Sequence, residues 1–186
     1  MKSSLWLAAN HCRTDRLAVM LKEKKARALA GINIALIKYW GKRDPAANLP
    51  AVGSISLTID SFTTETTVEF NTEHSEDIFT LNGQTQNDTR VVNLLDEVRQ
   101  LASIDSAATV TSVNRVPTAS GLASSASGTA ALAMAAWHAS GLPSDDLPNH
   151  PTFLDLVRRG SGSAPRSLLP GIVELDKLTG GIQSLW

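Results

Sequence analysis

The sequence has little from which a crosslinked, zinc-centred or membrane-spanning protein could be built. Its single cysteine, Cys12, cannot form an intramolecular disulfide, which excludes a disulfide-stapled secreted fold. The four histidines are far apart, so we expect no structural zinc site. No run approaches the roughly 18 apolar residues that a membrane helix needs. We therefore expect neither a disulfide framework nor a membrane-embedded protein.

The chain also lacks an excess of charge of either sign. Seventeen Lys and Arg residues face 18 Asp and Glu residues, a net charge of −1 over 186 residues. This balance disfavours nucleic acids and anionic membrane surfaces as partners. Apolar residues make up 42% of the chain and charged residues 19%, which is typical of a folded globular protein. With one cysteine and no signal-peptide cleavage site, we expect a cytoplasmic protein.

The N-terminal segment differs in character from the rest of the chain. Met1–Val19 shows neither strand alternation nor turn chemistry, so residues 1–25 are expected to form an extension, disordered or weakly helical. Its basic bias also resembles a mitochondrial transit peptide, although Asp15 and Glu23 interrupt the run. Met20 is an alternative start. Residues 26–186 are expected to form the folded domain.

Short apolar and alternating runs in the first half of that domain predict strands. Asn82-Gly83 follows one of them and is a strong hairpin signal, because both residues tolerate a positive φ. We expect an antiparallel region, with Ile55, Leu57 and Ile59 on one face of its second strand. The predicted strands are Ala26–Ala30, Ser54–Ile59, Thr64–Phe70 and Ile78–Leu81.

Helical periodicity then takes over and alternates irregularly with strands. Asn87–Ser103 carries apolar residues at helical spacing, and Asn87 or Asp88 can cap it. Ser124–Ser140 is an alanine-rich helix, and Thr152–Arg159 is a short one. Further strands are predicted at Ala108–Asn114 and Gly171–Leu175. Without regular βαβ alternation, this order predicts an α+β fold.

Pro117–Ala126 (Pro-Thr-Ala-Ser-Gly-Leu-Ala-Ser-Ser-Ala) is the first of three segments that can carry chemistry. It enters the alanine-rich helix through a Gly/Ser loop, which offers unpaired backbone N–H groups and the positive end of the helix dipole to a phosphate. The hydroxyls of Ser124 and Ser125 can add donors or bind Mg²⁺. The alternative is that one of these serines is an ordinary N-cap.

Asn33–Asp44 (Asn-Ile-Ala-Leu-Ile-Lys-Tyr-Trp-Gly-Lys-Arg-Asp) is the second segment. It places two lysines and an arginine beside two aromatic residues and after an apolar run. A lysine held against apolar surface is poorly solvated and favours an anion as its partner. The alternative is a strand that leads into a loop with solvated cations.

Arg158–Ser167 (Arg-Arg-Gly-Ser-Gly-Ser-Ala-Pro-Arg-Ser) is the third segment. Arg166 can bind a carboxylate or phosphate with two parallel hydrogen bonds, and Ser161, Ser163 and the loop amides can share that anion. The alternative is a flexible linker, against which Pro165 argues. Together the three segments suggest a ligand with several phosphates and a carboxylate.

These segments resemble those of a known family. Pro117–Ala126 matches every fixed position of the phosphate loop of the GHMP kinase superfamily. Asn33–Asp44 and Arg159–Ser167 resemble, more narrowly, two active-site segments of the mevalonate diphosphate decarboxylase (diphosphomevalonate decarboxylase) family. All three occur in the family's order. The resemblance covers residues 26–175, and its one departure within these segments is Pro165, where many relatives have Cys.

The resemblance implies an ATP-dependent decarboxylation in isoprenoid biosynthesis. The family transfers the γ-phosphoryl group of ATP to the tertiary 3-hydroxyl of mevalonate 5-diphosphate. Phosphate and CO₂ then leave, which gives isopentenyl diphosphate and ADP. The implied cofactors are ATP and Mg²⁺. The implied fold is an α+β, ribosomal-protein-S5-like N-terminal lobe of the GHMP kinase fold.

Carried over by position, the resemblance assigns the first segment to nucleotide and the other two to substrate. The implied ATP-binding residues are Pro117, Gly121, Leu122, Ala123, Ser124 and Ser125, with Ser125 also on the metal. The implied substrate-binding residues are Asn33, Lys38, Tyr39, Lys42, Ser161, Ser163 and Arg166, with Arg166 on the carboxylate. The implied catalytic residues are Lys38, Ser125 and Arg166.

Length is the main departure from the family, whose members are roughly twice as long and exceed the usual one-domain range. Their second, C-terminal lobe carries the aspartate assigned as the base, so we expect residues 26–186 to represent a truncated N-terminal domain. Two alternatives stay open. One is a related mevalonate or phosphomevalonate kinase or decarboxylase. The other is an inactive nucleotide-binding fragment. The family is usually homodimeric, so a homodimer is also open.

Overall fold

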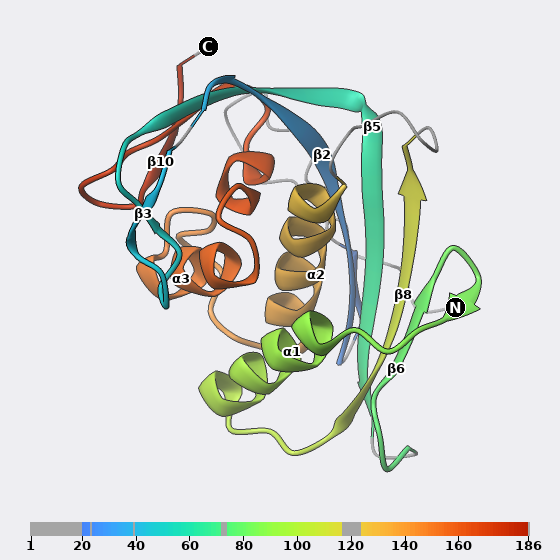
Figure 1. Cartoon of the computed structure of the whole chain (residues 1–186). Helices are drawn as coiled ribbons and strands as arrows, with labels where there is room; N and C mark the ends of the chain where they lie inside the picture. The colour runs from blue at the N-terminus through green and yellow to red at the C-terminus, as the bar shows by residue number, and fades with distance from the viewer. Residues whose placement is uncertain (1–19, 23, 39, 72–73, 117–123, 186) are drawn as a thin grey trace.

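A curved mixed sheet with helices on one face forms the framework of the computed structural model (Figure 1). The structure describes residues 20–22, 24–38, 40–71, 74–116 and 124–185. The large sheet has the strand order β1-β2-β5-β8-β6-β7, and β9 extends it by pairing with β5 and β10. Strands β3 and β4 form a separate hairpin. The α+β fold predicted from the sequence is confirmed.

Strand β6 has the predicted bounds, whereas β2 is longer than the predicted strand Ala26–Ala30. The strands are β1 (Met20–Lys22), β2 (Lys25–Ile37), β3 (Lys42–Asp44), β4 (Leu49–Pro50), β5 (Ser54–Asn71), β6 (Ile78–Leu81), β7 (Gln84–Thr85), β8 (Ala107–Arg115), β9 (Gly171–Leu175) and β10 (Ile182–Ser184). The helices are α1 (Thr89–Ala102), α2 (Ser125–Ala139), α3 (Pro151–Gly160) and the 3₁₀ helix η1 (Ala164–Leu168).

Strand β5 joins two segments that the sequence presented as separate strands. It pairs with β2 along most of its length, and the register shifts between Gly31 and Ile32. In Figure 1 the long strand β5 changes direction and passes over the helices. A Cβ at Gly31 would lie 2.8 Å from Thr58 Cγ2 and 3.0 Å from the carbonyl oxygen of Ile59. Glycine therefore permits the close approach of the two strands at the irregularity.

Strand β6 departs from the antiparallel pairing that we expected throughout this region. It pairs with β8 in parallel, and α1 supplies the crossover between them. A parallel pair needs such a connection because a tight turn reverses the chain. The hairpin at Asn82-Gly83 is confirmed, with φ of 50° and 81° at the two residues.

The three helices follow their sequence signals closely. Asp88 caps α1 and accepts a hydrogen bond from the amide of Arg90. Helix α2 packs on β2 and β5 through its alanines, which are almost completely buried and allow close contact with the sheet (Figure 1). Helix α3 begins with Pro151, a residue favoured in the first helical turn. None of the helices in the described part of the chain is long and apolar enough to cross a membrane.

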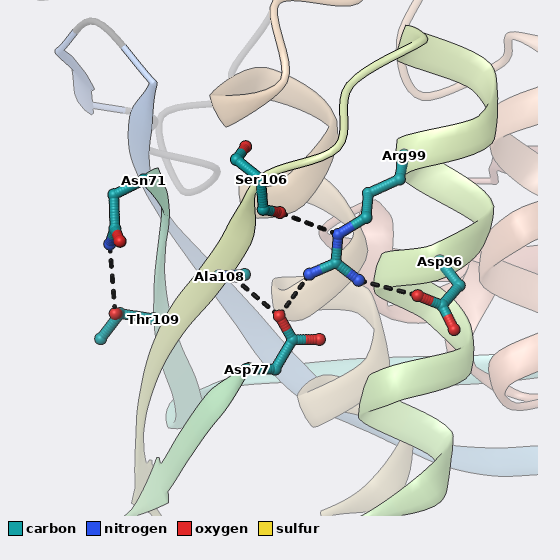
Figure 2. Close-up of polar contacts among 7 residues, drawn as sticks. All are labelled: Asn71, Asp77, Asp96, Arg99, Ser106, Ala108 and Thr109. Atoms are coloured by element: carbon teal, nitrogen blue, oxygen red, sulfur yellow. Dashed lines mark hydrogen bonds and ion pairs between the residues drawn. The ribbon is translucent and has the colours of Figure 1, made fainter. Parts of the chain in front are cut away.

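An arginine cluster fastens α1 to the start of β8 (Figure 2). Arg99 forms ion pairs with Asp77 and Asp96, and its Nε donates to the carbonyl of Ser106 at 2.9 Å. Asp77 also accepts from the amide of Ala108 at 2.8 Å. The side chains of Arg99 and Asp77 are only 14% and 17% exposed. The candidate functional site lies at the other end of β8, so this cluster supports the fold.

Candidate functional site

Asn33 joins two of the three segments singled out in the sequence. It lies in β2, and its Nδ2 donates to the carbonyl of Ser163 at 3.0 Å and to Ser167 Oγ at 2.8 Å. Asn33 and Ser163 are 130 positions apart in the chain. Their contact brings the Asn33–Asp44 segment beside the loop that follows α3. Sequence spacing alone could not have predicted this contact.

Arg166 is held in place from three directions. Only 2% of this residue is exposed. Its Nε donates to Ser56 Oγ at 3.0 Å, Nη1 donates to Ser54 Oγ, and Nη2 lies 3.4 Å from Asn33 Oδ1. The backbone is fixed as well, because Thr58 Oγ1 donates to the carbonyl of Arg166 at 3.1 Å. The flexible-linker interpretation of this segment is therefore wrong.

The buried face of β5 beside Arg166 is its polar face. Ser54, Ser56 and Thr58 are buried, whereas Leu57 between them is 41% exposed. Alternation in the sequence had placed the apolar residues on one face, and an apolar face normally lies inward. The arginine reverses this preference, because a buried guanidinium needs hydrogen-bond acceptors. This is why hydroxyl-bearing residues line the inner side of the strand.

Ser161 and Ser163 lie in the short link between α3 and η1. Both are half-buried, and their hydroxyl oxygens are 3.4 Å apart. Asn33 holds the backbone of this link through the carbonyl of Ser163. The structure thus places Ser161, Ser163, Arg166 and Asn33 in one neighbourhood, and their roles toward a ligand stay predictions.

Lys38 and Lys42 flank the chain's exit from β2. Lys38 follows the strand directly and is exposed, and Lys42 is exposed at the start of β3. Tyr39, which we had grouped with them, lies outside the described residues. Between them, Gly41 has a φ of 73° and its carbonyl accepts a hydrogen bond from the amide of Ala51 at 3.2 Å. This hydrogen bond closes the hairpin that carries Lys42, whereas Lys38 precedes the hairpin.

The first turn of α2 contains the two serines assigned to ATP. Ser124 occupies the N-cap position, but its side chain makes no capping hydrogen bond, and Ser125 is exposed. Asn114 Nδ2 instead lies 3.4 Å from Ser124 Oγ. Ser124 is thus the N-cap residue of α2 by position, without the side-chain hydrogen bond of an ordinary N-cap. Four further residues predicted to bind ATP lie outside the described residues: Pro117, Gly121, Leu122 and Ala123.

A buried polar network that sequence reasoning missed supports this helix start. Thr64 Oγ1 is 2.8 Å from Asn114 Oδ1 and 2.8 Å from Ser127 Oγ, and Ser127 Oγ donates to the carbonyl of Ser124 at 3.1 Å. Thr64 and Asn114 are direct cross-strand partners on β5 and β8. The strand register was the signal that could have revealed the pair, and a single sequence does not contain it. The network ties the first turn of α2 to the sheet.

A cavity of about 190 Å³ opens beside this helix start, between α1, α2 and the sheet. Ser124, Ser125 and Asn114 are among the residues that line it, and the lining is largely apolar. Asp88 also lines the cavity and accepts hydrogen bonds from the side chain of Arg90, which lower the pKa of this carboxyl group below its ordinary value. The cavity lies beside the N-terminus of α2. The first N–H groups of a helix lack partners within the helix, so this end favours an anion.

At the start of α2 a Mg²⁺ ion could bind hydroxyl oxygen, but the described residues do not surround this place with carboxylates. Among the residues that the structure describes, no three His, Cys, Asp or Glu side chains gather as a metal site. Mg²⁺ often keeps several waters and binds through few protein ligands together with substrate phosphates. The exposed hydroxyl of Ser125 at the helix N-terminus fits that mode of binding.

Comparison with known families matches most of the chain. Residues 30–185 match the family described as the diphosphomevalonate decarboxylase-like N-terminal domain. The chain is 40% identical over 176 residues to human diphosphomevalonate decarboxylase and 40% identical over 163 residues to the rat enzyme. These alignments cover 83% and 78% of this chain, but only 42% and 39% of the two relatives. The chain thus spans about two fifths of the length of these relatives.

Solved structures of the same family superpose well. The mevalonate diphosphate decarboxylase of Enterococcus faecalis is 45% identical, with a TM-score of 0.77 over 87% of this chain and 51% of that one. The Staphylococcus aureus enzyme is 43% identical, with a TM-score of 0.75 over 85% and 48%. The fold matches the N-terminal portion of these proteins. The chain therefore belongs to the diphosphomevalonate decarboxylase-like N-terminal domain family.

Proposed function

We propose that this chain binds Mg²⁺, ATP and mevalonate 5-diphosphate and contributes these binding sites to the ATP-dependent decarboxylation that yields isopentenyl diphosphate. The observation that carries the proposal is the hydrogen bonding of Asn33 to Ser163 and Ser167, which joins two family segments at one place. A related solved structure is described as MDDEF in complex with MVAPP, AMPPCP and magnesium, and it is 47% identical to this chain with a TM-score of 0.74. That likeness supports the same set of ligands here.

The nucleotide is assigned to the start of α2. The phosphates would accept hydrogen bonds from the amides and hydroxyls of Ser124 and Ser125, and the largely apolar cavity beside them would take the adenosine part. Mg²⁺ would be held by Ser125 and by phosphate oxygens. When bound, it neutralises the charge of the transferring phosphoryl group.

The substrate is assigned to the other two segments. Lys38, Tyr39 and Lys42 would hold the diphosphate, and Ser161 and Ser163 would add hydroxyl donors. Arg166 would hold the carboxylate. Its 3.4 Å approach to Asn33 Oδ1 is longer than its 3.0 Å contact with Ser56 Oγ, so a carboxylate oxygen would replace it at lower cost.

The chemistry needs these groups for positioning. The 3-hydroxyl oxygen bonds to the γ-phosphorus as the bond to ADP breaks, and the hydroxyl proton passes to a general base. The C3–O bond then breaks with release of phosphate, while the electrons of the bond to CO₂ form the new double bond. Lys38 and Lys42 would bind the diphosphate and neutralise its charge. Arg166 would orient the carboxylate that leaves as CO₂. None of the residues assigned here is the base.

Binding and turnover call for separate tests. In calorimetric titrations we expect the chain to bind mevalonate 5-diphosphate more tightly than mevalonate 5-phosphate, and ATP in a Mg²⁺-dependent manner. Equal affinity for the monophosphate would favour a related kinase or decarboxylase. Failure to bind either ligand would contradict the proposal. For the 186-residue chain, we expect CO₂ release no higher than background, since the base is not among its assigned residues.

A further inference from the structure

We infer that Arg158 and Asn48 are positioning residues that hold the cationic hairpin, residues 42–50, against the end of α3. This inference rests on the proposed function, because Lys42 of the hairpin is assigned to the diphosphate of the substrate. Residues Ser161 and Ser163 follow the same end of α3. Docking the hairpin there brings both substrate segments to one place.

The tip of the cationic hairpin is built to keep one shape. Asp44 Oδ1 accepts hydrogen bonds from the amides of Ala46 at 2.9 Å and Ala47 at 3.1 Å. Asn48 has a φ of 51°, a left-handed conformation that asparagine tolerates better than most residues. The tip can therefore transmit a fixed position to Lys42 at the base of the same hairpin.

Asn48 caps the end of α3. Its Nδ2 donates to the carbonyl of Arg159 at 2.9 Å and to that of Arg158 at 3.2 Å. The last carbonyls of a helix lack partners within the helix, so an outside donor satisfies them. One side chain thus ties the hairpin tip to the turn that leads into Ser161.

Arg158 completes the attachment from the α3 side. It is only 4% exposed, its Nε donates to the carbonyl of Ala47 at 3.0 Å, and its guanidinium pairs with Asp155 one turn earlier. Gly180, in the turn before β10, covers it, since a Cβ there would lie 2.8 Å from Arg158 Nη1. In Figure 1 the β3 hairpin, α3 and β10 lie on the same side of the molecule.

The neighbouring arginine serves as a contrast. Arg159 is exposed and its guanidinium forms an ion pair with Glu97 at 2.7 Å, so it links α3 to α1. Arg158 instead binds the hairpin, through the backbone carbonyl of Ala47. A purely structural role would affect stability alone, whereas a positioning role also affects the diphosphate affinity that depends on Lys42.

The test is a double-mutant cycle on diphosphate binding. Asn48→Gly keeps the left-handed backbone and removes only the side-chain amide, and Arg158→Met removes the guanidinium. We expect each to weaken mevalonate 5-diphosphate binding by roughly tenfold and to leave ATP affinity unchanged, since misplacing a binding group by about 1 Å is costly. In a Lys42→Ala background the same substitutions should have almost no further effect. Additive losses, or unchanged diphosphate affinity, would overturn the inference.

A measurement without ligand separates this inference from the proposed function. We expect Asn48→Gly and Arg158→Met to speed hydrogen exchange at the Ala51 amide, which closes the hairpin on Gly41, while α2 amides keep their protection. Arg27→Met, on the exposed face of β2, is the matched control and should change neither property. A wild-type chain that binds no diphosphate would contradict the proposed function. Unchanged exchange at Ala51 would overturn the docking of the hairpin itself.

Discussion

Replacing Asn33 by leucine tests the contact that brings the two substrate segments together. Leucine keeps the branching of the side chain but removes its hydrogen bonds to the carbonyl of Ser163 and the hydroxyl of Ser167. Each hydrogen bond contributes about 0.5–1.5 kcal/mol net, so we expect a loss of about 1–3 kcal/mol in unfolding free energy. The 3.4 Å contact with Arg166 adds little to this sum.

Urea unfolding followed by circular dichroism measures this loss as a lower midpoint at an unchanged slope. In a protein of this size, the corresponding fall in melting temperature is roughly 2–12 °C. Asn93→Leu, on the exposed side of α1, is the matched control and should shift stability by less than about 0.5 kcal/mol. If Asn33→Leu left the midpoint unchanged, or if the control lost as much, Asn33 would not be the link between β2 and the loop after α3.

Three further substitutions test other parts of the structure. Arg99→Met should lower the unfolding free energy by about 2–4 kcal/mol in urea titrations, because it leaves the carboxylate of Asp77 without its ion pair, and a loss under about 0.5 kcal/mol would refute this. Burial lowers the pKa of His138, so at acidic pH the unfolded chain binds a proton more readily than the folded chain does. The free energy of unfolding should therefore fall as the pH drops below about 6.5, and His138→Gln should reduce this fall. Equal pH dependence in both proteins would contradict that assignment. Gly31→Ala should cost about 1–3 kcal/mol in thermal melts, because its Cβ would press on the carbonyl of Ile59, whereas an unchanged melt would show that the two strands can separate there.

The sequence predicted the elements whose signals are local. Helix α1 was recognisable from apolar spacing and an Asp88 cap, and the Asn82-Gly83 hairpin from two residues that tolerate positive φ. Helix α2 was recognisable from its alanines. These features depend on neighbours a few positions apart, which a single sequence contains in full.

The arrangement around Arg166 depends on distant partners and could not be predicted in the same way. The buried hydroxyls of Ser54 and Ser56 lie more than 100 positions from the arginine that they accept from. Read alone, their strand indicated an inward apolar face. Only the fold shows that the arginine requires the polar face to lie inward.

The candidate site was located by pattern, and its residues were only partly placed by the structure. Asn33, Ser163 and Arg166 come together, and Ser124 and Ser125 begin α2 as expected. Neither Asn48 nor Arg158 was assigned a role from the sequence, because each acts through backbone carbonyls of a distant segment. The ligand-binding roles of Asn33, Ser163 and Arg166 stay predictions, which the experiments above test.

A calorimetric titration of the 186-residue chain with mevalonate 5-diphosphate in the presence of Mg²⁺ tests whether the two segments form a substrate site. We expect saturable binding at one site, and Lys42→Ala should weaken that binding by roughly tenfold through the loss of one cation. Arg27→Met, on the exposed face of β2 and outside the assigned segments, should bind as the wild type does. No saturable binding by the wild-type chain, or equal affinity for all three proteins, would contradict the claim that these segments form a substrate site.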